Sequence, residues 1–188
     1  MRRPFFFGYG SLVNRGTHSY QNASPARISG WRRAWRHSPV RAVSFLTAVP
    51  CPDTEIDGLV AEVPGHDWCA LDAREYAYER LYATTAVSHA IPDPADIAIY
   101  AIPAGKHQRP GPDHPVLLSY LDVVIQGYLA EFGEEGVARF FATTDGWDAT
   151  ILDDRAAPVY SRHRETSDVE RQLVDDHLAS VSAIIRRA

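Results

Sequence analysis

A glycine-rich loop stands near the start of the chain, where Tyr9–Leu12 (Tyr-Gly-Ser-Leu) follows the aromatic run Phe5–Phe7. Three aromatic residues in a row predict a buried strand, and glycine lets the backbone after it come close to a bound group. The common nucleotide motifs do not fit: counted from Gly8, the sixth position of a dinucleotide fingerprint is Val13, and no Gly-Lys-Ser/Thr is present. Ser11 also lacks the flanking glycines of a nucleophile elbow. The loop therefore predicts either a tight turn or contact with another kind of ligand.

A second stretch that could do chemistry is 71–80, which mixes carboxylates with arginines. Its charged residues are Asp72, Arg74, Glu75, Glu79 and Arg80. A positioned carboxylate can take a proton from one substrate atom and give it to another, and partial burial raises its pKa toward neutrality. Leu71, Tyr76 and Tyr78 could supply the apolar walls that such burial needs. By itself, however, the stretch is typical of a solvated helix end with charge pairs.

The sequence gives little support for a metal site or for a disulfide framework. The 8 histidines include no His-x-x-x-His and no His-Glu-x-x-His pattern, so we expect neither a metal site nor a metal cofactor. The 2 cysteines, Cys51 and Cys69, are too few for a disulfide framework or a thiolate zinc site. Two reduced thiols are expected, and a single disulfide between them stays open.

Nucleic acid is also an unfavoured partner. The formal net charge of −5 would repel nucleic acid and anionic membranes. The segment Gly30–His37 mixes arginines and tryptophans, as an RNA-binding surface can. In a strand, however, Trp31, Arg33 and Trp35 share one face, which favours packing of the tryptophans on a core. We therefore do not expect nucleic acid as a partner.

The order of elements predicts an α+β protein, because β-type patterns come first and helical periodicity later. The expected strands are Phe5–Phe7, Ala26–Arg36, Arg41–Ala48, Ile56–Val63, Tyr78–Ser88 and Asp96–Ile102. The expected helices are His66–Arg74, Val116–Phe132, Gly133–Thr144 and Asp168–Ile185, with an irregular loop over Pro103–Pro115.

One domain over residues 1–188 is expected, with a core at about 4–132 and a helical tail at about 133–188. No segment approaches the roughly 20 apolar residues of a membrane span. The apolar run after Arg2 and Arg3 is also shorter than the roughly 7–15 residues of a secretory signal. We therefore expect a cytoplasmic protein without membrane contact.

Taken in this order, the two stretches resemble the γ-glutamylcyclotransferase superfamily and, within it, the ChaC-like branch. The family signature is a first strand that enters Tyr-Gly-Ser-Leu, here Tyr9–Leu12 after Phe7-Gly8. The family's catalytic glutamate lies in a Leu-Asp-x-x-Glu context, here Leu71-Asp72-Ala73-Arg74-Glu75. A family tyrosine on a later helix is similar to Tyr120. The resemblance covers about Pro4 to Tyr128.

The resemblance implies a mixed fold with a small β-barrel-like sheet core, flanked by helices and followed by a helical C-terminal tail. It implies that a γ-glutamyl compound, such as glutathione or a γ-glutamyl-amino acid, is cyclised to 5-oxoproline with release of an amine or peptide. Glu75 would be the general acid and base, and no cofactor would be needed. The implied substrate-binding residues are Tyr9, Gly10, Ser11, Leu12 and Tyr120. Backbone N–H groups of the loop would face the substrate carboxylate or the oxyanion.

Two departures from the family pattern keep other functions open. Tyr76-Ala77-Tyr78 follows the glutamate directly, where ChaC-like members usually have Gly-Gly-Tyr or Gly-Tyr. Residues 133–188 match no family function. One alternative is a cyclotransferase dedicated to a carrier-bound or specialised γ-glutamyl metabolite. Another is a non-catalytic module that binds γ-glutamyl or other small acidic ligands. The leaving group, the oligomeric state and any contact of Tyr120 with substrate are left undetermined by the sequence.

Overall fold

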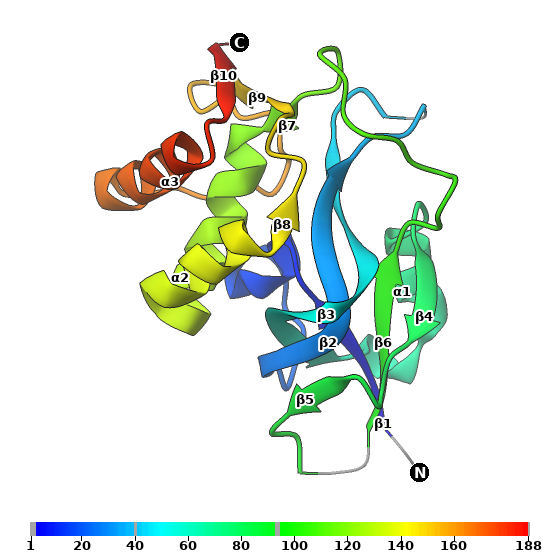
Figure 1. The fold of residues 1–188 in the computed structure, drawn as a ribbon. Coiled ribbons are helices and arrows are strands. Elements are labelled where there is room, and N and C mark those ends of the chain that lie inside the picture. Colours follow the sequence, from blue (N-terminus) through cyan, green and yellow to red (C-terminus); the bar gives the residue numbers. More distant parts are fainter. Residues whose placement is uncertain (1–2, 40, 93–94, 188) are drawn as a thin grey trace.

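The computed structural model describes residues 3–39, 41–92 and 95–187. Its described strands form a mixed sheet of 7 strands in the order β4-β6-β1-β3-β2-β5, with β8 paired to β2 (Figure 1). These strands are β1 (Arg3–Gly8), β2 (Ser24–Arg36), β3 (Phe45–Glu62), β4 (Glu79–Tyr82), β5 (Val87–His89), β6 (Ala95–Ala101) and β8 (Thr144–Asp145). The expected α+β class is confirmed. Within the described chain the barrel-like sheet that the resemblance implied is open and not closed, because β4 and β5 are short edge strands that pair with β6 and β2 and not with each other.

The aromatic run at the start of the chain forms the centre of this sheet. Strand β1 pairs antiparallel with β3 and parallel with β6, so both of its edges are covered. Phe5 and Phe7 belong to the large core cluster, and Phe6 packs with Leu71 and Tyr100 in a second, smaller cluster. Alternate side chains of a strand point to opposite faces, so three consecutive phenylalanines fill the cores on both sides of the sheet. The glycine loop therefore starts from a rigid base.

The longest strand differs from its prediction. Arg41–Ala48 and Ile56–Val63 were expected as separate strands, but Phe45–Glu62 is one strand that pairs along β2. The prolines and acidic residues between the two apolar runs suggested a break. Instead, the register shifts there, and residues 51–54 stand opposite the single Gly30, whose φ is +81°. A bulge absorbs these residues without ending the pairing.

The expected strand Tyr78–Ser88 is likewise two strands, β4 and β5, separated by a turn. The turn is closed by the Ala86 N–H, which donates to the Ala83 carbonyl at 2.9 Å. The Thr84 hydroxyl accepts a 2.9 Å hydrogen bond from the Ile97 N–H. A side-chain oxygen therefore replaces a backbone partner at this point, and the strand pattern continues only after the turn.

The α-helices of the described chain are α1 (Trp68–Arg74) and α2 (Leu118–Ala142), which lie against the sheet, and α3 (Asp168–Ser180), which packs on α2. Figure 1 shows α1 and α2 on opposite sides of the sheet. The expected helix over His66–Arg74 is confirmed with a slightly later start, at an Asp67 cap whose side chain accepts from the Cys69 N–H at 2.8 Å. Gly133, expected to stop a helix, lies inside α2 as a kink with φ of +65°. The two helices expected here therefore follow each other within one element.

The last helix is shorter than expected. It begins at a Ser167–Glu170 capping box, but it ends at Ser180 instead of Ile185. Ser182 then adopts a φ of +55°, which reverses the chain into β10 (Ile184–Arg187). Strand β10 joins a second sheet in the order β10-β9-β7, formed with β9 (Thr150–Asp153) and β7 (Val116–Leu117). Helical periodicity cannot reveal this change, because Ile185 continues the apolar pattern of α3.

Two further expectations bear on function. Cys51 and Cys69 are free thiols, as expected. Among the described residues, no helix is both long enough and apolar enough to cross a membrane.

Candidate active site

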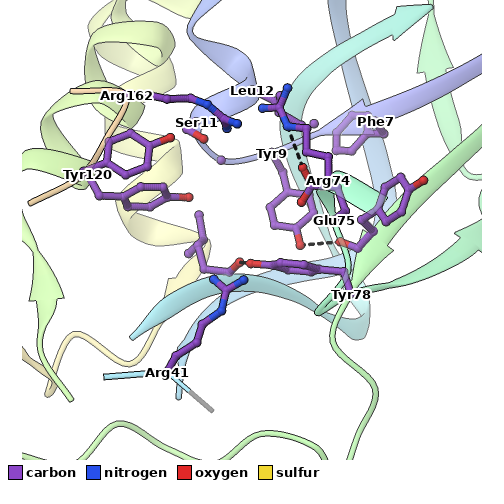
Figure 2. Close-up of a pocket in the computed structure, with 15 residues that line it drawn as sticks. Phe7, Tyr9, Ser11, Leu12, Arg41, Arg74, Glu75, Tyr78, Tyr120 and Arg162 are labelled. Atoms are coloured by element: carbon purple, nitrogen blue, oxygen red, sulfur yellow. Dashed lines mark hydrogen bonds and ion pairs between the residues drawn. The ribbon is translucent and has the colours of Figure 1, made fainter. Parts of the chain in front are cut away.

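The two stretches selected from the sequence meet at one pocket of about 210 Å³ (Figure 2). The glycine loop comes from the end of β1, Glu75 from the end of α1, and Tyr120 from the first turn of α2. The lining residues are Phe7, Gly8, Tyr9, Gly10, Ser11, Leu12, Arg41, Leu46, Arg74, Glu75, Tyr78, Tyr100, Tyr120, Tyr160 and Arg162. All of the expected site residues thus line a single pocket, and their roles stay predictions.

The glycine loop is shaped by close contacts that a side chain would block. After Gly10 the chain forms a 3-10 turn, in which the Val13 N–H donates to the Gly10 carbonyl at 2.9 Å. A Cβ at Gly8 would lie 2.7 Å from the Leu12 Cβ, and a Cβ at Gly10 would lie 2.7 Å from the Tyr120 Oη. Real Cβ atoms are almost never found so close to another atom. The glycines therefore let the loop fold over itself and against Tyr120.

Replacing Gly10 with Ala should impair the site rather than the fold. The new methyl group would displace the Tyr120 hydroxyl from the loop, and a misplaced site group commonly costs about 100-fold in rate. For the γ-glutamyl substrate that the resemblance implies, we expect a fall of about that size in turnover. Gly111→Ala is the matched control, because its Cβ would meet nothing closer than the His114 Nδ1 at 4.0 Å. Equal activity of the two variants would contradict this role for Gly10.

Tyr9 anchors the loop through its hydroxyl. The hydroxyl donates to the Tyr100 carbonyl at 2.6 Å and accepts from the Ala48 N–H at 3.1 Å. Its ring is buried, and this burial raises the pKa of the phenol well above its ordinary value. The Tyr9 carbonyl accepts from the Arg33 Nε at 3.3 Å. Tyr9 is therefore expected to act as a wall and an anchor, and its hydroxyl is already occupied by the backbone.

Glu75 is the acidic group of the pocket. It caps α1, where its N–H donates to the Leu71 carbonyl at 2.9 Å, and its side chain is only 20% exposed. Its Oε1 lies 3.2 Å from the Arg74 Nε. Burial raises the pKa of the Glu75 carboxyl, and the positive charges of Arg74, Arg162 and Arg41 oppose this rise without cancelling it. A carboxylate with a raised pKa is suited to proton transfer.

The apolar walls beside Glu75 differ in part from expectation. Tyr78 lines the pocket, and its hydroxyl donates to the Leu46 carbonyl at 3.1 Å. Tyr76 is 74% exposed, and Leu71 lies in the smaller core cluster beneath α1. Neither of these two lines the pocket, because the chain turns at the end of α1 and points consecutive side chains in different directions. Tyr100, which sequence reasoning did not identify, provides another wall.

Tyr120 serves both the core and the site. Its ring packs edge-on against Trp35 at a centroid distance of 6.0 Å and against Tyr160 at 5.0 Å. Its hydroxyl lies at the glycine loop, close against Gly10. Burial raises the pKa of this phenol, so it keeps its proton at neutral pH. A protonated phenol at this place can donate a hydrogen bond to a ligand.

Two pocket residues come from the tail, Tyr160 and Arg162. The tail is fastened to the start of α2 by Asp154, a buried carboxylate that accepts from the Ser119 N–H at 2.8 Å and from the Ser119 Oγ at 2.6 Å. The Tyr160 N–H in turn donates to the Ser119 Oγ at 3.3 Å. Among the residues that the structure describes, the tail thus contributes to the pocket, whereas the loop Pro103–Pro115 does not.

Arg41 is a further residue that the sequence did not single out for the site. It lies in the connection between β2 and β3 and reaches the pocket from there (Figure 2). No local signal marks Arg41 or Arg162 as site residues, since each is an ordinary arginine in an irregular segment. Within the described residues, no group of three or more His, Cys, Asp or Glu side chains could hold a metal ion.

Comparison with known proteins identifies the fold. No protein-family model matches the chain, and no curated protein matches it in sequence. A solved structure of a γ-glutamyl cyclotransferase superimposes with a TM-score of 0.57, covering 92% of this chain and 98% of that chain at 15% identity. The chain has the γ-glutamyl cyclotransferase fold. An uncharacterized protein from Homo sapiens shares this fold with a TM-score of 0.58, 14% identity and coverage of 91% of this chain and 97% of that chain.

YkqA from Bacillus subtilis has the same cyclotransferase fold over a part of its length. Its TM-score is 0.55 at 15% identity, covering 78% of this chain and 57% of that chain. At these identities the likeness concerns the fold alone. In this chain the loop after β1 and the end of α1 line the same pocket, next to Gly8 at the end of β1.

Proposed function

We propose that this protein is a γ-glutamylcyclotransferase that converts a γ-glutamyl compound into 5-oxoproline and a free amine or peptide. The observation that carries the proposal is Glu75, a carboxylate with a raised pKa that shares one pocket with the Tyr9–Leu12 loop. The fold of a γ-glutamyl cyclotransferase supports it. A pure binding module would gain little from a buried carboxylate beside an amine that it does not deprotonate.

The reaction is an intramolecular aminolysis. The substrate's α-ammonium group first loses a proton to solvent, and the resulting amine attacks the γ-carbonyl carbon. As this C–N bond forms, Glu75 takes a second proton from the attacking nitrogen. Glu75 then gives that proton to the leaving nitrogen as the original C–N bond breaks, which regenerates the carboxylate. Because nucleophile and electrophile belong to one molecule, correct folding of the substrate supplies much of the rate enhancement.

The glycine loop and Tyr120 are assigned to the oxygen of the γ-carbonyl. This oxygen becomes negatively charged when the ring closes, and hydrogen-bond donors aimed at it stabilise the transition state. The loop N–H groups around Gly10 and the Tyr120 hydroxyl lie on the same side of the pocket. Removing one such donor typically costs about 100- to 1,000-fold in rate. No metal or organic cofactor has a role in this scheme.

The proposal is tested by incubating the full chain with glutathione, two γ-glutamyl-amino acids and a γ-glutamylamine. We expect 5-oxoproline to appear together with an equal amount of free amine or peptide, measured by mass spectrometry. Release from none of these compounds by folded protein would contradict a general cyclotransferase. Tight binding without release would identify a non-catalytic module, and the absence of both would point to an enzyme for a carrier-bound or specialised metabolite.

A further inference from the structure

Two arginines of the pocket form no ion pair within the described chain, although their charges act on Glu75 from a distance. Arg74 pairs with Glu75 and donates to the Tyr20 hydroxyl. Arg41 and Arg162, in contrast, form no ion pair with any carboxylate of the described chain. A guanidinium that faces a pocket without a carboxylate partner is available to a carboxylate of a ligand, and it can bind that group through two parallel hydrogen bonds.

The charge of the pocket points to the same kind of ligand. Of the lining residues in the described chain, Glu75 alone is acidic, whereas Arg41, Arg74 and Arg162 are basic. The pocket thus carries a positive excess even when Glu75 is ionised, although the chain as a whole has a net charge of −5. A positive pocket on an acidic protein selects ligands with more than one negative group.

The two arginines lie on different sides of the pocket. Figure 2 shows Arg162 on the side that carries Ser11 and Leu12, whereas Arg41 reaches toward the pocket from the opposite side, past Tyr78. If the γ-glutamyl part of the substrate lies on the Ser11 side, Arg162 is placed at its α-carboxylate. Arg41 is then placed beyond the scissile bond, where the leaving group must lie.

We propose that Arg41 binds a carboxylate on the leaving group, so that the preferred substrates are γ-glutamyl-amino acids or γ-glutamyl-peptides and not γ-glutamylamines. This inference rests on the proposed cyclotransferase activity and specifies its substrate class. Arg162 takes the other substrate carboxylate, the α-carboxylate that both classes share. Two unpaired arginines thus match two carboxylates, whereas a γ-glutamylamine offers one.

Arg41 is held in place before substrate binds. Its Cζ lies 5.6 Å from the centroid of the Phe45 ring and 5.8 Å from that of the Tyr76 ring. The backbone N–H of Arg41 donates to the Ser38 carbonyl at 3.1 Å. Aromatic contacts of this kind hold a guanidinium without using up its hydrogen-bond donors. Less rotational freedom is then lost when Arg41 engages a carboxylate. Tyr76, which does not line the pocket, gains a role here as part of this support.

A pair of substrates that differ only in the carboxylate tests the inference. γ-Glutamylalanine and γ-glutamylethylamine have the same γ-glutamyl part, and the second lacks only the leaving-group carboxylate. We expect wild type to prefer γ-glutamylalanine in kcat/KM. Arg41→Met should lower kcat/KM for γ-glutamylalanine by about 10- to 100-fold, the usual effect of losing a charge-assisted pair. The fall for γ-glutamylethylamine should be much smaller, because this substrate loses only the effect of the Arg41 charge on Glu75.

Matched variants separate this role from a structural one. Arg41→Lys should retain part of the preference, because it keeps the charge and loses the paired geometry. Arg162→Met should lower turnover of both substrates, and Arg109→Met, an exposed arginine outside the pocket, should change neither. An equal effect of Arg41→Met on both substrates, or no effect on either, would overturn the inference while leaving the proposed function intact. Release of 5-oxoproline from neither substrate by wild type would overturn the proposed function itself.

Discussion

Replacing Glu75 with Gln should lower kcat/KM for 5-oxoproline release by about 100- to 10,000-fold, the range that general acid–base catalysis contributes. The amide keeps the size of the side chain but cannot take a proton from the attacking nitrogen. In wild type, kcat/KM should rise with pH through the raised pKa of Glu75, because the ionised form is the base. This rise should be missing from the residual activity of Glu75→Gln. Steady-state kinetics over the acidic and neutral pH range measures both effects.

The same substitution should not weaken the fold. Because burial raises the pKa of Glu75, the folded protein favours the protonated form. As pH rises from the ordinary glutamate pKa through the raised value, ionisation of the buried group therefore lowers the free energy of unfolding. Glu75→Gln should be at least as stable as wild type at about pH 8, and the difference should shrink toward about pH 4. Urea unfolding at both pH values checks this, and a variant that is less stable only at high pH would contradict the raised pKa.

Replacing Arg33 with Ala should lower the free energy of unfolding by about 3–5 kcal/mol, through a cavity and several unpaired polar groups. Arg33 is fully buried between the sheet and α2. Its Nη2 donates to the Asp57 carbonyl and to the Tyr128 hydroxyl, each at 2.7 Å. Its Nε supports the Tyr9 carbonyl at the base of the glycine loop. Denaturant unfolding gives the loss of stability, and activity at a permissive temperature reports the effect on the loop.

The neighbouring Arg32 provides the control for this prediction. It lies on the other face of β2, where its Nε pairs with the Asp145 Oδ1 at 2.8 Å and its side chain is partly exposed. Surface pairs of this kind contribute about 0–1 kcal/mol, so Arg32→Ala should be far milder. Similar losses in the free energy of unfolding for Arg33→Ala and Arg32→Ala would contradict the large contribution assigned to the buried contacts of Arg33.

The site could be predicted from the sequence where short motifs determine local structure. The Tyr9–Leu12 loop needs glycine at Gly8 and Gly10 because of contacts within a few residues and with Tyr120. Glu75 ends a helix that the sequence also indicated. These groups meet in one pocket, as the resemblance implied. These site residues therefore come from two short segments, each of which can be recognised in the sequence by itself.

The pocket arginines Arg41 and Arg162 could not be predicted in the same way. Arg162 reaches the pocket because buried Asp154 fastens the tail to Ser119, a contact between residues 35 positions apart in the chain. Arg41 lies in a connection whose position depends on the pairing of β2 and β3. The continuous strand β3 was not predicted, because prolines between two apolar runs are typical of a strand end. The bulge opposite Gly30 also interrupts the alternating pattern. Contacts between residues far apart in the chain position these side chains, and local sequence patterns do not predict such contacts.

The measurement that tests the central claim most directly is the identity of the glutamyl product formed in water enriched in oxygen-18. In the proposed intramolecular aminolysis, the γ-carbonyl oxygen is kept and no water enters the product. Wild-type protein should therefore release unlabelled 5-oxoproline from γ-glutamylalanine, together with one equivalent of alanine. Release of glutamate with oxygen-18 in its γ-carboxylate would show that water is the nucleophile, and it would contradict the assignment of Glu75 as the base toward the substrate's own amine.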